Sequence, residues 1–189
     1  MHPTIRDARA SEIRELAALL ASCFAEYGRR LPPGIWNAYR AEIGNLEERR
    51  AVSELIVASD GARLVGTVTF FPDATFDAHG WPQGASSLRL LAVDPAFRGM
   101  GIGRLLIEEC RRRARALQVR SLGLHTADVM AAGIKLYERM GFVRAPLLDF
   151  DPHAHYEADP TATGKDDQGQ TATHSSYCPV RGLAYVLEL

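Results

Sequence analysis

The stretch FRGMGIGRLL, residues 97–106, places three glycines at alternate positions immediately before an apolar pattern typical of a helix. These are Gly99, Gly101 and Gly103. A dinucleotide-binding fingerprint needs the order G-x-G-x-x-G, and a nucleotide P-loop needs Gly-Lys followed by Ser or Thr. This stretch matches neither pattern, so it is not a Rossmann or P-loop motif. It is either a tight turn or a phosphate cradle of another kind.

Physical chemistry favours the phosphate cradle over the turn. Without side chains, Gly101 and Gly103 let backbone N–H groups approach a ligand closely. These groups lie at a helix N-terminus, which carries about half a positive charge. Arg98 and Arg104 add charge on either side. A plain turn needs only one or two glycines and no flanking arginines, so the loop predicts a diphosphate site.

The elements around this loop indicate a mixed α/β fold. Apolar patterns and turn residues predict strands at 4–6, 54–59, 63–71, 87–93, 121–126, 142–150 and 183–189. Helical spacing predicts one helix that ends around Gly28, a second that spans Ile35 to Ile43, a third after the glycine loop and a fourth at 130–140. In the third helix we expect these residues to face the core: Leu105, Leu106, Cys110, Ala114 and Leu117. A strand-turn-helix unit thus lies at the centre of the chain.

Length and composition predict a single domain over residues 1–189. The chain is 47% hydrophobic and 24% charged, which is enough apolar material for one core. The segment 151–182 departs from this composition, because Asp, Thr, His, Gly and Gln dominate it. It is either a solvated excursion or a flap over an acceptor site.

The charge balance and the chain's beginning exclude several classes of partner. The formal net charge is −1, so no overall positive field favours nucleic acid or an anionic membrane. The beginning, MHPTIRDARASE, lacks the pattern of a secretory signal, and no run is apolar enough to span a membrane. We therefore expect a cytoplasmic protein. Cys23, Cys110 and Cys178 match no metal or disulfide pattern, so no metal is expected.

Two segments resemble the motifs of one enzyme family. LAVDPAFRGMGIGRLLIEEC, residues 91–110, resembles the acetyl-coenzyme A motif of the GNAT N-acetyltransferases, Arg/Gln-x-x-Gly-x-Gly/Ala, through Arg98, Gly101 and Gly103. AAGIKLYERMGF, residues 131–142, resembles the second family motif, in which a helix with Leu-Tyr precedes Gly-Phe. The resemblance implies a strongly twisted sheet of six to seven strands, flanked by about four helices. In this fold the fourth and fifth strands splay into a V-shaped slot.

The resemblance also implies which residues bind acetyl-coenzyme A. Amides of the glycine loop would hold the pyrophosphate, and backbone groups of the fourth strand would pair with the pantetheine arm. The residues assigned in this way are Leu91, Val93, Arg98, Gly99, Gly101, Ile102, Gly103 and Arg104. The arginine run at 111–113, with Arg115, could reach the 3′-phosphate, but such a run is also typical of a solvated helix face.

Catalysis needs an acid for the leaving thiolate and a base for the attacking amine. Tyr137 in the second motif is the expected acid, because a phenol with a reference pKa of about 10 can donate a proton. Its alternative role is a hydrogen bond to the sulfur or simple core packing. Neither Ser87 nor Arg89 on the fourth strand is a plausible base. The expected base is His125, which ends the fifth strand, and the other candidates are Glu26, Asp149 and His153.

The sequence gives little information about the acceptor substrate. The family places it between the first two helices and the last two strands, here FAEYGRRLPPGIW (24–36) and DFDPHAHY (149–156). Their acids and aromatics suit a cationic amine, and Arg29 and Arg30 suit a carboxylate. We expect the primary amine of a small molecule or peptide. Two alternative functions stay open. One is a catalytically silent regulator that binds acyl-coenzyme A, and the other is a transferase for another acyl chain or for a hydroxyl acceptor. A homodimer also stays open.

Overall fold

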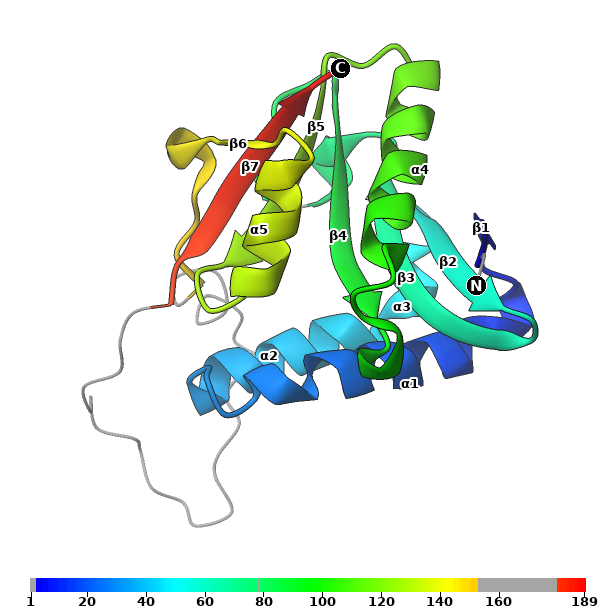
Figure 1. Cartoon of the computed structure of the whole chain (residues 1–189). Coiled ribbons are helices and arrows are strands. Elements are labelled where there is room, and N and C mark those ends of the chain that lie inside the picture. Colours follow the sequence, from blue (N-terminus) through cyan, green and yellow to red (C-terminus); the bar gives the residue numbers. More distant parts are fainter. Residues whose placement is uncertain (1–2, 78, 153–179) are drawn as a thin grey trace.

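The computed structural model, which describes residues 3–77, 79–152 and 180–189, is built on one mixed β-sheet (Figure 1). Its strands lie in the order β1-β2-β3-β4-β5-β7-β6. All neighbouring strands are antiparallel except β4 and β5, which are parallel. Their bounds are Thr4–Asp7 (β1), Glu54–Asp60 (β2), Arg63–Phe71 (β3), Ala85–Val93 (β4), Ser121–Ala127 (β5), Val143–Arg144 (β6) and Gly182–Glu188 (β7). The predicted mixed sheet is confirmed.

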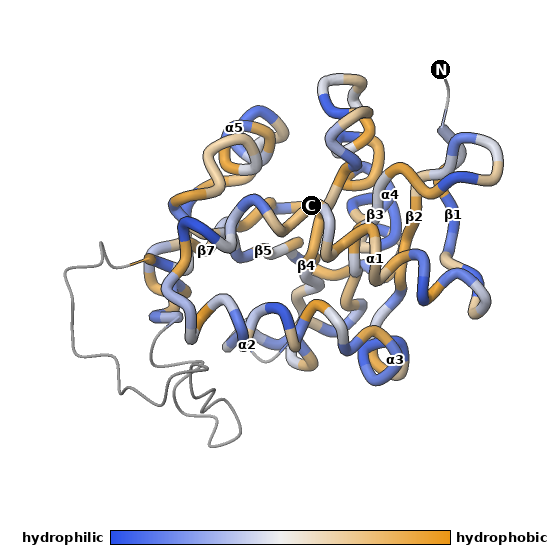
Figure 2. The backbone as a smooth tube through the Cα atoms, turned by 90° about the horizontal axis from the view of Figure 1, so that it is seen from below, coloured by the Kyte–Doolittle hydropathy of each residue, from blue (hydrophilic) through white to orange (hydrophobic). Residues whose placement is uncertain are grey.

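Helices cover both faces of this sheet, as Figure 2 shows. One face carries α1 (Ile13–Phe24), α2 (Pro33–Gly44) and the short α3 (Leu46–Arg49), and the other carries α4 (Ile102–Ala116) and α5 (Ala131–Arg139). Strand residues alternate between the two cores, because successive side chains of a strand point to opposite faces. In β2, for example, Val57 packs with α1 and Ile56 packs with α4.

The sheet opens between β4 and β5. Pairing of these strands runs from Ala85↔Ser121 to Leu88↔Leu124 and stops there, although both strands continue. The two strands then diverge toward their carboxyl ends (Figure 1). At this point β4 contains a β-bulge, with a positive φ of 51° at Leu90 and a register shift against β3. The expected V-shaped splay is therefore present.

Some expected elements differ in the structure. The segment 142–150 was expected to form one strand, but only Val143–Arg144 is a strand, followed by a 3-10 turn at Pro146–Leu148 and one isolated bridge at Phe150. Pro146 explains this difference, because proline has no N–H to donate to a sheet. In α4, Leu105 and Leu117 are 41% and 50% exposed, so their expected core positions were wrong.

Most of the polar excursion lies outside the described residues. The structure describes only its ends, residues 151–152 and 180–182, so its proposed role as a flap stays a prediction. Within the described ranges, no helix is both long enough and apolar enough to cross a membrane. Over those same ranges, no cluster of three or more His, Cys, Asp or Glu residues could hold a metal ion.

Candidate active site

A large cleft with a volume of about 760 Å³ lies beside the opening of the sheet. It is formed by the glycine loop, the first turn of α4, the last residues of β4 and one side of α5. A volume of this size is typical of sites that enclose a cofactor. All the residues assigned to acetyl-coenzyme A from the sequence line it, namely Leu91, Val93, Arg98, Gly99, Gly101, Ile102, Gly103 and Arg104.

The glycine loop presents main-chain donors to this large cleft. Gly99 and Gly101 both have φ of +80°, a left-handed conformation that side chains disfavour, and Gly101 is the N-cap of α4 without any side-chain cap. The first amides of a helix have no intrahelical acceptor. A Cβ at Gly103 would lie only 3.1 Å from Leu136 Cδ2. The bare backbone and the uncapped amides therefore fit a diphosphate.

Arginines surround this loop. The large cleft is lined by Arg98, Arg104, Arg111 and Arg139, with Glu108 as its one acidic side chain among the described residues. Arg98 donates from Nε to the Val93 carbonyl at 3.2 Å and pairs with Glu26 at 2.7 Å. This excess of positive charge matches a ligand that carries several phosphates.

The arginine run on α4 divides between two roles. Arg111 lines the large cleft, whereas Arg113 packs against the sheet edge, 2.6 Å from Asp7 and 2.5 Å from Glu54. Arg112 pairs with Glu109. Only Arg111 among these three is thus placed to contact a ligand, and the other two are structural.

Tyr137 also lines the large cleft. It is 7% exposed, and its ring packs 6.0 Å from Phe142 and 6.5 Å from Tyr185, measured between ring centroids. Burial raises the pKa of Tyr137 above its ordinary value. The phenol is therefore protonated at neutral pH.

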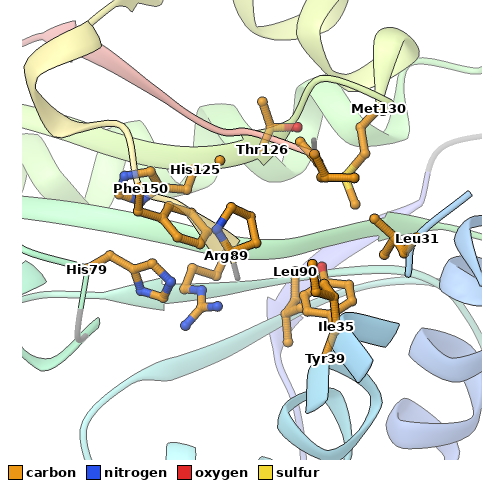
Figure 3. Close-up of a pocket in the computed structure, with 14 residues that line it drawn as sticks. Leu31, Ile35, Tyr39, His79, Arg89, Leu90, His125, Thr126, Met130 and Phe150 are labelled. Atoms are coloured by element: carbon orange, nitrogen blue, oxygen red, sulfur yellow. The ribbon is translucent and has the colours of Figure 1, made fainter. Parts of the chain in front are cut away.

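A small pocket of about 80 Å³ lies near the opening of the sheet, and Figure 3 shows residues that line it. Helix α2 forms one wall, the middle of β4 and the end of β5 form another, and Phe150 and Val180 lie at its side. Thr126 and Met130 line both the small pocket and the large cleft. The two sites therefore meet at the splayed strands, as a two-substrate reaction requires.

His125 lines the small pocket in a single tautomer. Its Nε2 lies 2.7 Å from the Leu148 carbonyl oxygen, which can only accept, so Nε2 carries the hydrogen. Its Nδ1 is buried and has no hydrogen-bond partner among the residues that the structure describes. The Trp81 ring packs 4.5 Å from the imidazole, measured between centroids. Burial lowers the pKa of His125 to about 4, so the ring is neutral at pH 7 with a lone pair on Nδ1.

Arg89 lines the small pocket and is held by two carboxylates. Its Nη1 lies 3.2 Å from Asp77 Oδ1, and its Nη2 pairs with Glu42. The Asp77 carboxylate is fully buried and accepts from Trp81 Nε1 at 2.9 Å and from Ser87 Oγ at 2.7 Å. Burial by itself would raise the pKa of Asp77, but its hydrogen bonds and the Arg89 charge lower it below its ordinary value.

The expected acceptor segments are only partly present at the small pocket. Leu31 and Ile35 come from the first segment, and Phe150 and Pro152 from the second. The charged residues expected there do not line it: Glu26, Arg29, Arg30, Asp149 and Asp151.

The alternative bases are engaged elsewhere or not described. Asp149 pairs with Arg144 at 2.7 Å, Glu26 pairs with Arg98, and His153 lies outside the described residues. The sequence interpretation missed His79 and Arg89 as pocket residues. The one available signal was a charged side chain inside the apolar strand SLRLLAV.

Comparisons with known proteins agree with this geometry. The chain is 28% identical over 151 residues to IAA acetyltransferase of Azospirillum brasilense, covering 79% of this chain and 92% of that protein. It is 28% identical over 111 residues to mycothiol acetyltransferase of Geodermatophilus obscurus, covering 59% of this chain but only 35% of that longer relative.

Solved structures share the fold. A GNAT family acetyltransferase from Elizabethkingia anophelis with acetyl-CoA bound has a TM-score of 0.64 at 15% sequence identity, covering 100% of this chain and 99% of that chain. At this identity the likeness concerns the fold alone. The family model of the acetyltransferase (GNAT) family matches residues 13–142, and the chain therefore belongs to that family.

Proposed function

We propose that this protein transfers the acetyl group of acetyl-coenzyme A to the primary amine of a small molecule or peptide. One observation carries the proposal: an uncapped glycine loop at the start of α4 lines a large cleft that meets a second pocket where β4 and β5 diverge. The related fold with acetyl-CoA bound supports the same donor.

The donor would be held mainly by main-chain groups. Amides from Gly99 to Arg104 would bind the pyrophosphate, with Arg111 near the 3′-phosphate. Beyond Leu88, no strand among the described residues pairs with β4 on its β5 side, so Leu91 and Val93 can pair with the pantetheine arm as a strand would. The Leu91 N–H would polarise the acetyl carbonyl.

The proposed reaction is direct attack of the neutral amine on the thioester carbonyl. A C–N bond forms and the C–S bond breaks. His125 would receive the proton of the amine as the nitrogen becomes acidic during attack. Tyr137 donates its phenolic proton to the departing sulfur. The products are the N-acetylated acceptor and coenzyme A with a free thiol.

The test is thiol release from acetyl-coenzyme A in the presence of amino acids, polyamines, aminoglycosides, peptides and small alkylamines. Release that depends on one class of amine supports the proposal. Tight binding of acetyl-coenzyme A by calorimetry without release for any acceptor would favour a silent binding module. The same assay with longer acyl-coenzyme A donors and with hydroxyl acceptors tests the other alternative.

A further inference from the structure

The ionisable side chains that line the small pocket share one property. Among the described residues these are Tyr39, His79, Arg89 and His125, and none of the lining residues is an Asp or Glu. Their carboxylate partners, Asp77 and Glu42, do not line the pocket. Arg89 therefore gives the described wall of the pocket a positive charge, and the negative charge of its partners is set behind the wall.

We propose that the acceptor carries an anionic group, such as a carboxylate, close to its amine, and that Arg89 recognises this group; the proposal rests on the acetyltransferase function. A guanidinium is planar and matches the geometry of a carboxylate. The Arg89 side chain is only 12% exposed, so water screens its charge poorly.

The surroundings hold Arg89 in place before any ligand binds. The guanidinium forms ion pairs with Asp77, in the turn before β4, and with Glu42, in helix α2. Asp77 is itself held by Trp81 and Ser87. A side chain fixed in this way loses little conformational freedom on binding, so more of its interaction energy appears as affinity.

The pocket also orients such an acceptor. Its amine would lie near Thr126, where the pocket meets the large cleft. Leu31 and Ile35 offer an apolar wall for the carbon skeleton (Figure 3). The complementary ligand is a small amphipathic molecule with one amine and one anionic group. A polyamine would place a second cation in a pocket that already contains Arg89.

Matched acceptors test this assignment. We would measure kcat/KM for leucine, leucinamide and isopentylamine, and for γ-aminobutyrate and butylamine, with spermidine as the polycation. In at least one set, kcat/KM of the wild-type protein should be about tenfold or more higher for the acceptor with a carboxylate than for the acceptors without one. The reason is that acceptors without a carboxylate lose a charge-assisted hydrogen bond to Arg89. The variant Arg89→Lys keeps the charge but loses the planar fork, and it should reduce this preference by about tenfold.

Arg49→Lys is the matched control. Arg49 also pairs with Glu42 and is buried, but it does not line the pocket, so the preference should stay unchanged. If the wild-type protein acetylates spermidine, or the amines that lack an anionic group, as fast as the carboxylates or faster, the inference is overturned. The acetyltransferase function would stay intact. An unaltered preference in folded Arg89→Lys would overturn the role of Arg89. No thiol release with any amine would overturn both proposals, and if Arg89→Lys fails to fold, the wild-type preferences decide.

Discussion

The large cleft and the small pocket are built from different parts of the chain. The large cleft includes main-chain groups of the glycine loop, of the first turn of α4 and of the end of β4, where no described strand pairs on the β5 side. The small pocket presents side chains, which come from α2, the turn before β4, β4 itself and β5. A backbone site requires particular conformations, whereas a side-chain site requires particular residues. Substitutions should therefore act on the two sites by different rules.

Gly101→Val should give the largest effect, a loss of acetyl-coenzyme A affinity of about a thousandfold. A branched side chain disfavours the φ of +80° at this position, and it would block the approach of the anion to several amides. Calorimetry measures this loss. Gly84→Val is the control, since Gly84 has φ of +79° but does not line the large cleft. If both variants bind the donor equally well, the phosphate role of the loop is refuted.

Tyr137→Phe should lower kcat by about a hundredfold and leave the Kd for acetyl-coenzyme A unchanged, because only the proton donor is removed. Steady-state kinetics and calorimetry separate the two quantities. Tyr185→Phe is the matched control, since Tyr185 packs against the same ring but does not line the large cleft. An unaltered kcat in Tyr137→Phe would remove this residue as the acid.

His125 should make stability depend on pH. Its pKa is about 4 in the folded protein against an ordinary 6.5, so the unfolded chain binds more protons between these values. The free energy of unfolding should therefore fall by about 3 kcal/mol as the pH drops from 6.5 to 4, and be fully recovered above 6.5. Urea denaturation across this range should show a much smaller fall in His125→Gln. An identical fall in both proteins would contradict the burial of His125.

Leu91→Ala should give the smallest effect, a change of less than about threefold in the Kd for acetyl-coenzyme A, because the proposed contacts use its N–H and C=O. Calorimetry again measures it. A loss as large as that expected for Gly101→Val would break the distinction between a backbone site and a side-chain site.

The same distinction explains what the sequence could predict. The glycine loop is visible as a local spacing, because main-chain conformation depends on neighbouring residues. The role expected for Tyr137 comes instead from the resemblance of residues 131–142 to a family motif. The group formed by Glu42, Asp77 and Arg89 joins a helix, a turn and a strand that only the folded sheet brings together. Leu105 was misplaced for a related reason: helical spacing identifies an apolar stripe, but packing decides its edge.

The bulge at Leu90 has an evolutionary consequence. Before it, Leu88 packs with α4, and after it, Leu90 and Ala92 pack with α1, so the alternation of β4 changes phase. Arg89 and Leu90, although consecutive, consequently line the same small pocket. Insertion or deletion of one residue here would exchange the two faces of the strand and disrupt both sites together. On the proposed role of Arg89, new acceptors would arise by replacement of the residue at 89 and not by a change in the length of β4.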